Sequence, residues 1–315
     1  MKRFIKKVLI FILLVSVLLS TLVIFDYKVV GSQYKYSYNA AILDKLDRLK
    51  SINEPKIILV GNSNVAYGFD SKLIEEEFDM PVVNMGLHAG LGNAFHEEAA
   101  KQGINKGDIV VVCHSDYSDT DTIGDAELAL LTYDYNDEVF KIFRKKDYKD
   151  LIKAYPTYLR KSYLLYLTHK GNLKTDNSYC RDAFNEYGDV VYKPIDKPIT
   201  AEFFKKNHSA LPKVSNECVT RLNELNDYCN KKGATLVVAG YPIEHGEYDT
   251  YTREDIMDFQ NELSEKLDCP VISDFTDYMY PYDYFYNAIL HLNENGAKVR
   301  SEQLISDLHN WMDNK

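Results

Sequence analysis

The sequence predicts an α/β protein, with a doubly wound sheet of about five parallel strands covered by helices on both faces and one apolar segment in front of it. Three observations predict this architecture. Five short apolar runs are each bounded by turn residues, as strands buried on both faces should be. Helical patterns separate most of these runs, which is typical of a parallel sheet. Residues 8–25 contain no charged residue.

The N-terminal segment is predicted to be an uncleaved membrane anchor. Its 18 uncharged residues would form a helix of about 27 Å, enough to cross a bilayer core. Four basic residues precede it, which places the N-terminus in the cytoplasm and the rest of this single-pass chain outside the cell membrane. A cleaved signal peptide is the alternative, but "LSTLVIFDYK" has no convincing small-x-small cleavage site. We therefore expect a cytoplasmic stub and anchor (1–27), a linker with an amphipathic helix (28–54) and one domain (55–315).

The elements follow in order along the chain. "NAAILDKLDRLKSI" predicts an amphipathic helix with Ile42, Leu46 and Leu49 on one side. Strands are then predicted at 56–60, 81–85, 108–113, 235–240 and 270–274. Helices are predicted at 71–78, 91–104, 214–232, 253–267 and 294–312.

One interval breaks the alternation of strands and helices. Residues 117–212 are rich in Tyr, Asp and Lys and contain helical patches such as "NDEVFKIFRKKDYKDLIKAY". We interpret this interval as an insertion that packs beside the sheet and could wall a cleft.

Charge and cysteine content exclude some classes of function. Without the four basic residues before the anchor, 33 basic residues face 47 acidic ones, so the outer part carries about −14. This balance disfavours nucleic acid as a partner, and also a passive grip on anionic polymers. The five cysteines have no metal-binding spacing and predict no disulfide framework. No metal site and no phosphate-binding glycine loop is visible, so we expect no cofactor.

The stretch "KIILVGNSNVAYGFDS" places Ser63 just after the first predicted strand. Parallel sheets bind their ligands at the carboxyl ends of the strands. Gly61 allows a tight turn there, and asparagines flank the serine on both sides. On composition alone, a turn residue or helix cap is the more common role for such a serine. A nucleophilic role requires a base elsewhere in the chain.

His291 is the best candidate for that base. It lies in "NAILHLNENGAKVRSEQL", between the fifth predicted strand and the last helix, which Asn293 could cap. In a five-stranded doubly wound sheet this loop can return to the carboxyl end of the first strand. Ser63 and His291 are therefore expected to meet.

Three motifs in this order resemble the SGNH (GDSL-like) hydrolase superfamily. They are "VGNSN" after the first strand, "NMGLHAGLG" after the second and "HLNENGA" before the last helix. The resemblance covers roughly residues 55–115 and 232–310, and "FNEYGD" (184–189) resembles the same group. The similarity is strongest to the membrane-anchored bacterial envelope branch, which includes the teichoic acid D-alanyl transfer protein and polysaccharide O-acetyl enzymes.

The resemblance implies a fold and a set of roles. The fold would be the three-layer, flavodoxin-like SGNH fold. Ser63 matches the nucleophile, and Gly86 matches the glycine whose backbone N–H helps to bind the oxyanion beside that of Ser63. His291 matches the general base, which later acts as an acid.

The sequence departs from the family pattern at two places. The third block of the family supplies an oxyanion-binding asparagine, but "CHSDYSD" contains none. The acid that orients the histidine usually lies three or four residues before it, where this chain has Asn287 and Ala288. We expect Asn287 to orient the imidazole, although Asp283, Asp277 or Asp274 could substitute for it.

The predicted function is that of an esterase or O-acyltransferase with a weakened triad, acting on an envelope or exported polysaccharide through an acyl-serine. The resemblance also implies a membrane partner that supplies the acyl group. An inactive relative that binds a glycan or an assembly partner is the second hypothesis, and a plain structural ectodomain is the third.

Overall fold

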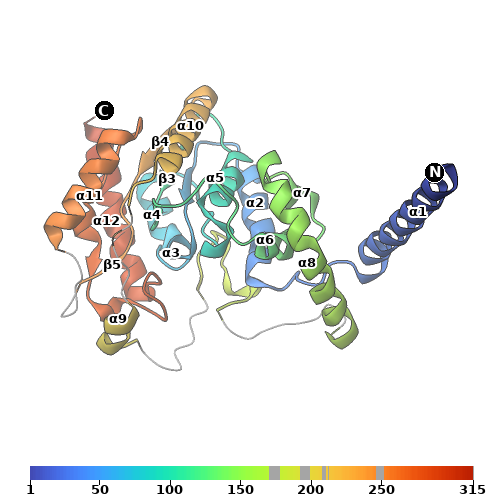
Figure 1. Cartoon of the computed structure of the whole chain (residues 1–315). Coiled ribbons are helices and arrows are strands. Elements are labelled where there is room, and N and C mark those ends of the chain that lie inside the picture. Colours follow the sequence, from blue (N-terminus) through green and yellow to red (C-terminus); the bar gives the residue numbers. More distant parts are fainter. Residues whose placement is uncertain (170–177, 192–198, 208–210, 212, 246–251, 315) are drawn as a thin grey trace.

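The centre of the molecule is a four-stranded parallel sheet in the order β2-β1-β3-β4 (Figure 1). The computed structural model describes residues 1–169, 178–191, 199–207, 211, 213–245 and 252–314. The strands are β1 (Ile57–Val60), β2 (Val82–Asn84), β3 (Ile109–Val112) and β4 (Thr235–Val238). Each lies inside a predicted range, and the order reverses direction at β1, so the prediction of a parallel α/β sheet is confirmed.

The prediction of a fifth full strand at 270–274 is wrong. Only Val271 pairs with the sheet, through an isolated parallel bridge to Val238. The chain then leaves the sheet because Asp274 caps a 3₁₀ turn over Phe275–Tyr278, accepting a hydrogen bond from the N–H of Thr276. Directly after this turn, β6 (Met279–Tyr280) pairs in parallel with the earlier strand β5 (Ile243–Glu244), and these two strands form a separate sheet.

Helices cover both faces of the sheet, since alternate strand residues point to opposite sides. One face buries Ile58, Val60, Val110 and Val112 against α2 (Ile42–Ser51), α5 (Asn93–Lys101), α10 (Asn216–Lys232) and α11 (Arg253–Lys266). The other face buries Ile57, Leu59, Val111 and Val237 against α4 (Ser71–Phe78) and α12 (Glu294–Asp313). Figure 1 shows α12 and α2 on opposite sides of the strands.

The described part of the interval 117–212 combines α-helices with turns and loops. It contains α6 (Ala126–Tyr133), α7 (Asp137–Phe140), α8 (Tyr148–His169) and α9 (Ala201–Asn207). Leu130, Val139, Leu151 and Tyr158 from this interval belong to the same buried cluster as the residues under the sheet. The insertion is therefore continuous with the main core, and parts of it fall outside the described residues.

The N-terminal helix α1 (Lys2–Phe25) is long and apolar enough to span a membrane, and none of its residues is buried. A single turn of π-helix, Asp26–Val30, connects it to the domain. Phe25 stacks on Tyr163 of α8, with ring centroids 6.0 Å apart. The Asp134 carboxylate accepts hydrogen bonds from the backbone N–H groups of Gln33 and Tyr34. The segment after α1 is thus docked on the domain.

Candidate functional site

Ser63 lies at the carboxyl end of β1, where the chain turns into the short helix α3 (Ser63–Ala66). Asn62 caps this helix, and its side-chain oxygen accepts a hydrogen bond from the N–H of Asn64 at 2.9 Å. A glycine is required at position 61, because a Cβ there would lie 2.9 Å from the carbonyl oxygen of Cys113. As the first residue of α3, Ser63 has no acceptor for its N–H within that helix.

The turn that presents Ser63 is held from two other elements. Asn64 is buried, and its amide nitrogen donates to the Cys113 carbonyl after β3. Arg300 of α12 is also fully buried and donates to the backbone oxygen of Asn64 at 2.7 Å and to its side-chain oxygen at 3.0 Å. The same guanidinium donates to the Gly240 carbonyl after β4 at 3.0 Å. Burial lowers the pKa of Arg300, and these acceptors offset part of that cost.

Ser63, His291 and Asn287 form one hydrogen-bonded row. Ser63 Oγ lies 2.9 Å from His291 Nε2, although the two residues are 228 positions apart. His291 Nδ1 lies 2.8 Å from Asn287 Oδ1. Because the amide oxygen can only accept, Nδ1 carries the proton in this arrangement and Nε2 is free to accept the serine proton. The catalytic roles of these residues stay a prediction.

The loop that carries His291 is tightly closed. Tyr286 donates its backbone N–H to the His291 carbonyl at 2.8 Å, and His291 donates its own to Ala288 at 3.2 Å. Asn293 then caps α12 through a hydrogen bond from the N–H of Gly296. These bonds set the position of the imidazole relative to the start of α12.

Two aromatic residues that the sequence did not single out touch this row. The Tyr67 ring stacks on the His291 imidazole with centroids 4.1 Å apart and planes 4° from parallel. The Tyr179 hydroxyl accepts a hydrogen bond from the Asn287 amide nitrogen at 3.2 Å, which leaves the amide oxygen facing the histidine. Tyr67 is one helical turn after Ser63, a spacing that could have indicated it. Tyr179 comes from the insertion and has no such signal.

Gly86 lies against α3, but its N–H already has an acceptor. A Cβ at this position would lie 2.3 Å from the backbone nitrogen of Ala66, so only glycine fits. The Gly86 N–H donates to the Asn84 side-chain oxygen at 2.9 Å. In this conformation that bond competes with the predicted role of Gly86 as an oxyanion donor, which stays a prediction.

The other candidates from the sequence lie in different surroundings. Asp274 caps the 3₁₀ turn at Phe275–Tyr278. The backbone carbonyl of Asp283 accepts a hydrogen bond from the side-chain amide of Asn293. In the third block, the Ser115 hydroxyl accepts a hydrogen bond from the Asn62 amide nitrogen at 2.8 Å. His114, which also follows a strand, is buried and lies 2.9 Å from the Glu97 carboxylate, which also forms an ion pair with Arg221.

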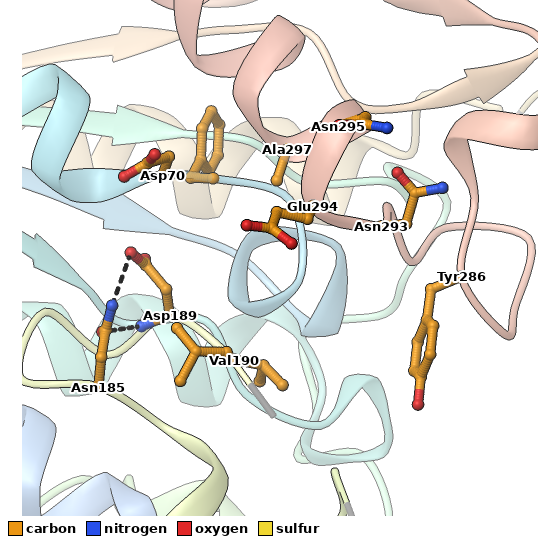
Figure 2. Close-up of a pocket in the computed structure, with 11 residues that line it drawn as sticks. Asp70, Asn185, Asp189, Val190, Tyr286, Asn293, Glu294, Asn295 and Ala297 are labelled. Atoms are coloured by element: carbon orange, nitrogen blue, oxygen red, sulfur yellow. Dashed lines mark hydrogen bonds between the residues drawn. The ribbon is translucent and has the colours of Figure 1, made fainter. Parts of the chain in front are cut away.

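A cavity of about 420 Å³ lies beside the histidine loop (Figure 2). Its lining includes the carboxylates of Asp70, Asp189 and Glu294, of which Asp189 is buried and accepts hydrogen bonds from Ser71. Tyr286 lines the same cavity and stacks on Tyr67, with centroids 5.9 Å apart. One aromatic ring therefore separates the cavity from the ring that packs on His291. Within the described ranges, no three His, Cys, Asp or Glu side chains are grouped so as to hold a metal ion.

Comparisons of the chain with protein-family models, with curated proteins and with solved structures found no match. Any functional assignment therefore depends on the residues and the geometry of the chain itself.

Proposed function

We propose that the chain is a membrane-anchored, extracytoplasmic esterase or O-acyltransferase of the SGNH type that acts on an envelope or exported polysaccharide. This proposal includes the three-layer, flavodoxin-like SGNH form of the α/β fold. The observation that carries it is the row of Ser63, His291 and Asn287 at the carboxyl end of β1, with contacts of 2.9 and 2.8 Å. A serine beside an oriented imidazole is the arrangement that nucleophilic catalysis needs.

The chemistry would proceed through an acyl-serine. Ser63 Oγ attacks the ester carbonyl while its proton moves to His291 Nε2. The protonated imidazole then returns the proton to the leaving alcohol as the tetrahedral intermediate collapses. Water or a sugar hydroxyl attacks the acyl-serine in the second half, and His291 again removes its proton. The N–H of Ser63 would stabilise the oxyanion.

Asn287 makes this triad weaker than one with a carboxylate. The neutral amide fixes the tautomer of His291 but cannot stabilise the imidazolium by charge. The same substitution in a serine protease triad lowers the rate by about 10⁴. Slow turnover, or turnover with an activated acyl donor, is the expected consequence.

The neighbouring cavity favours a neutral polyhydroxylated substrate. Asp70 and Glu294 are exposed carboxylates in its lining, and Asn185, Asn293 and Asn295 add amide groups (Figure 2). Carboxylate and amide oxygens accept hydrogen bonds from sugar hydroxyls. The same carboxylates repel anionic polymers, in agreement with the net charge of the chain.

An inactive glycan-binding or partner-binding relative is the second candidate. Two observations favour it, namely the amide at position 287 and the internal hydrogen bond of the Gly86 N–H. A protein that kept only the fold would retain the row of side chains without a competent oxyanion site.

A fluorophosphonate probe on the purified full chain tests the proposal. The probe should label the wild-type chain at Ser63 and leave Ser63→Ala unlabelled. His291→Gln should lower the labelling rate at least 100-fold, within the range expected for a general base. If folded wild-type protein is not labelled above the Ser63→Ala background, the binding function is favoured instead.

A further inference from the structure

An apolar hollow lies in the insertion, away from the candidate active site. It has a volume of about 310 Å³ and is lined only by leucine, isoleucine and aromatic residues. We define the aromatic face by six of them: Tyr133, Phe140, Phe143, Tyr148, Ile152 and Tyr155. Three of these side chains are exposed on the surface: Ile152 by 72%, Phe140 by 45% and Tyr148 by 37%. An exposed apolar surface of this kind marks a contact with a partner or a membrane.

The aromatic face is linked to the end of α1 by a chain of ring contacts. Tyr27, just after α1, packs edge-on against Tyr135 with centroids 5.4 Å apart. Tyr135 contacts Tyr133, and Tyr133 contacts Phe140 at 5.7 Å. Phe140 in turn stacks on Tyr148 at the start of α8. If α1 crosses a bilayer, these rings continue from its outer end, at the level where tyrosines concentrate in membrane proteins.

Basic residues are concentrated in the segment 141–153, which carries half of the aromatic face, although the chain as a whole is acidic. Between positions 141 and 153 the sequence has six basic and two acidic residues, against a net charge of −10 for the full chain. Four of these six cations are ion-paired, namely Lys141, Arg144, Lys146 and Lys153. Lys145 and Lys149 are exposed and form no ion pair with the described part of the chain. An apolar face with a basic rim is typical of elements that lie in the headgroup region of anionic membranes.

We propose that the aromatic face is a membrane-docking surface, and that its hollow takes an acyl chain of a bilayer lipid while the lysines contact anionic headgroups. This inference depends on α1 being in the membrane and is independent of whether Ser63 reacts. A lipid is favoured over a protein occupant because ring contacts link the face to the outer end of α1 and because the same segment carries the exposed Lys145 and Lys149, which are outside its ion pairs. The end of α1, α7 and the first half of α8 would then meet the bilayer together.

Photo-crosslinking in vesicles tests the proposal. The full chain is reconstituted in vesicles of phosphatidylglycerol and phosphatidylcholine that include a phosphatidylcholine with a diazirine at the end of one acyl chain. After illumination, peptide mapping by mass spectrometry should find label in α1 and in residues 133–155. Ile152→Glu should lower the label in residues 133–155 at least fivefold and leave the label in α1 unchanged. Omitting phosphatidylglycerol from the vesicles should lower the label in residues 133–155 at least twofold.

Met257→Glu is the matched control, because Met257 is an exposed apolar residue on α11 outside the aromatic face. It should leave both sites of labelling unchanged. The proposal is overturned if α1 is labelled and residues 133–155 are not, which would assign the face to a protein partner. Equal labelling of wild type and Ile152→Glu would also overturn it, as would the absence of label from α1.

Discussion

At the scale of single residues, Asn287 decides how strong the candidate triad can be. It holds His291 Nδ1 at 2.8 Å and is itself held by the Tyr179 hydroxyl. The imidazole is therefore well oriented, and what the site lacks is a negative charge behind it. Orientation and charge stabilisation can be separated here by one substitution.

Asn287→Asp should raise Ser63-dependent turnover of a small acetyl ester by at least tenfold. A carboxylate at this position would keep the hydrogen bond to Nδ1 and stabilise the imidazolium, and the reverse change in other triads costs about 10⁴. Steady-state kinetics of the wild type, Asn287→Asp and Asn287→Asp/Ser63→Ala check this. An unchanged rate that still depends on Ser63 would mean that Asn287 is not the orienting residue.

Tyr67 should act as a positioning residue through its stack on His291. Tyr67→Leu removes the stack and should lower the labelling rate of Ser63 by about tenfold, the upper range for an aromatic pair. Tyr67→Phe keeps the stack and loses the hydrogen bond from the hydroxyl to the Ser178 carbonyl, so its rate should stay within about threefold of wild type. Equal losses in both variants would contradict the role of the stack.

At the scale of elements, α12 does more than cover the sheet. Its cap, Asn293, follows the histidine by two residues, and its Arg300 fixes the turn that carries the serine. One helix therefore sets the distance between the two halves of the site. Helix packing and site geometry cannot be varied independently in this chain.

Arg300→Lys should lower the free energy of unfolding by about 2–3 kcal/mol, because a lysine has one nitrogen where the guanidinium uses two. The Asn64 backbone oxygen and the two acceptors that share the other nitrogen, Asn64 Oδ1 and the Gly240 carbonyl, cannot all be paired, so a buried acceptor is left without a donor. The labelling rate of Ser63 should fall as well. Denaturant unfolding of the full chain in detergent measures the first effect. Arg253→Lys, at the exposed start of α11, is the control and should change neither quantity. A loss of the same size in the control would contradict the argument.

Several elements follow from local sequence, and others do not. Helix α4 has its predicted bounds, because Asp70 caps it and the apolar spacing is clear. The fifth strand fails because Asp274 favours a capped turn over continued pairing, and an apolar run such as "PVISD" does not reveal that competition. The pairing of Ser63 with His291 could be predicted from their positions in loops. The contact between Tyr179 and Asn287 could not be predicted, because it depends on how the insertion folds back onto the sheet.

At the scale of the whole molecule, buried ionisable groups link stability to pH. His96 of α5 is buried, and burial together with the neighbouring His114 lowers its pKa to about 3. In the unfolded chain its pKa would be near 6.5. Between these two pKa values the unfolded state binds more protons than the folded state. The stability that comes from keeping His96 neutral is therefore fully present above about pH 6.5, and it is lost as the pH falls toward 3.

His96→Gln should reduce this acid sensitivity. Between pH 6.5 and 5, stability of the wild type should fall by up to about 1.4 kcal/mol per pH unit from this residue, and the variant should lack that contribution. Urea unfolding at the two pH values measures the slope, whatever the variant costs at neutral pH. The same slope in wild type and His96→Gln would refute the assignment.

The docking of residues 26–34 on the insertion has a consequence for how the domain finds its substrate. A free tether of this length would let the domain sample a wide shell above the bilayer. Here the Phe25–Tyr163 stack and the Asp134 hydrogen bonds hold the connection against the domain. With α1 across a membrane, Ser63 would stay at a nearly constant height and its search would be two-dimensional. Under the proposed function, strands of polymer that pass at that height would be modified, and those further out would be spared however well they fit.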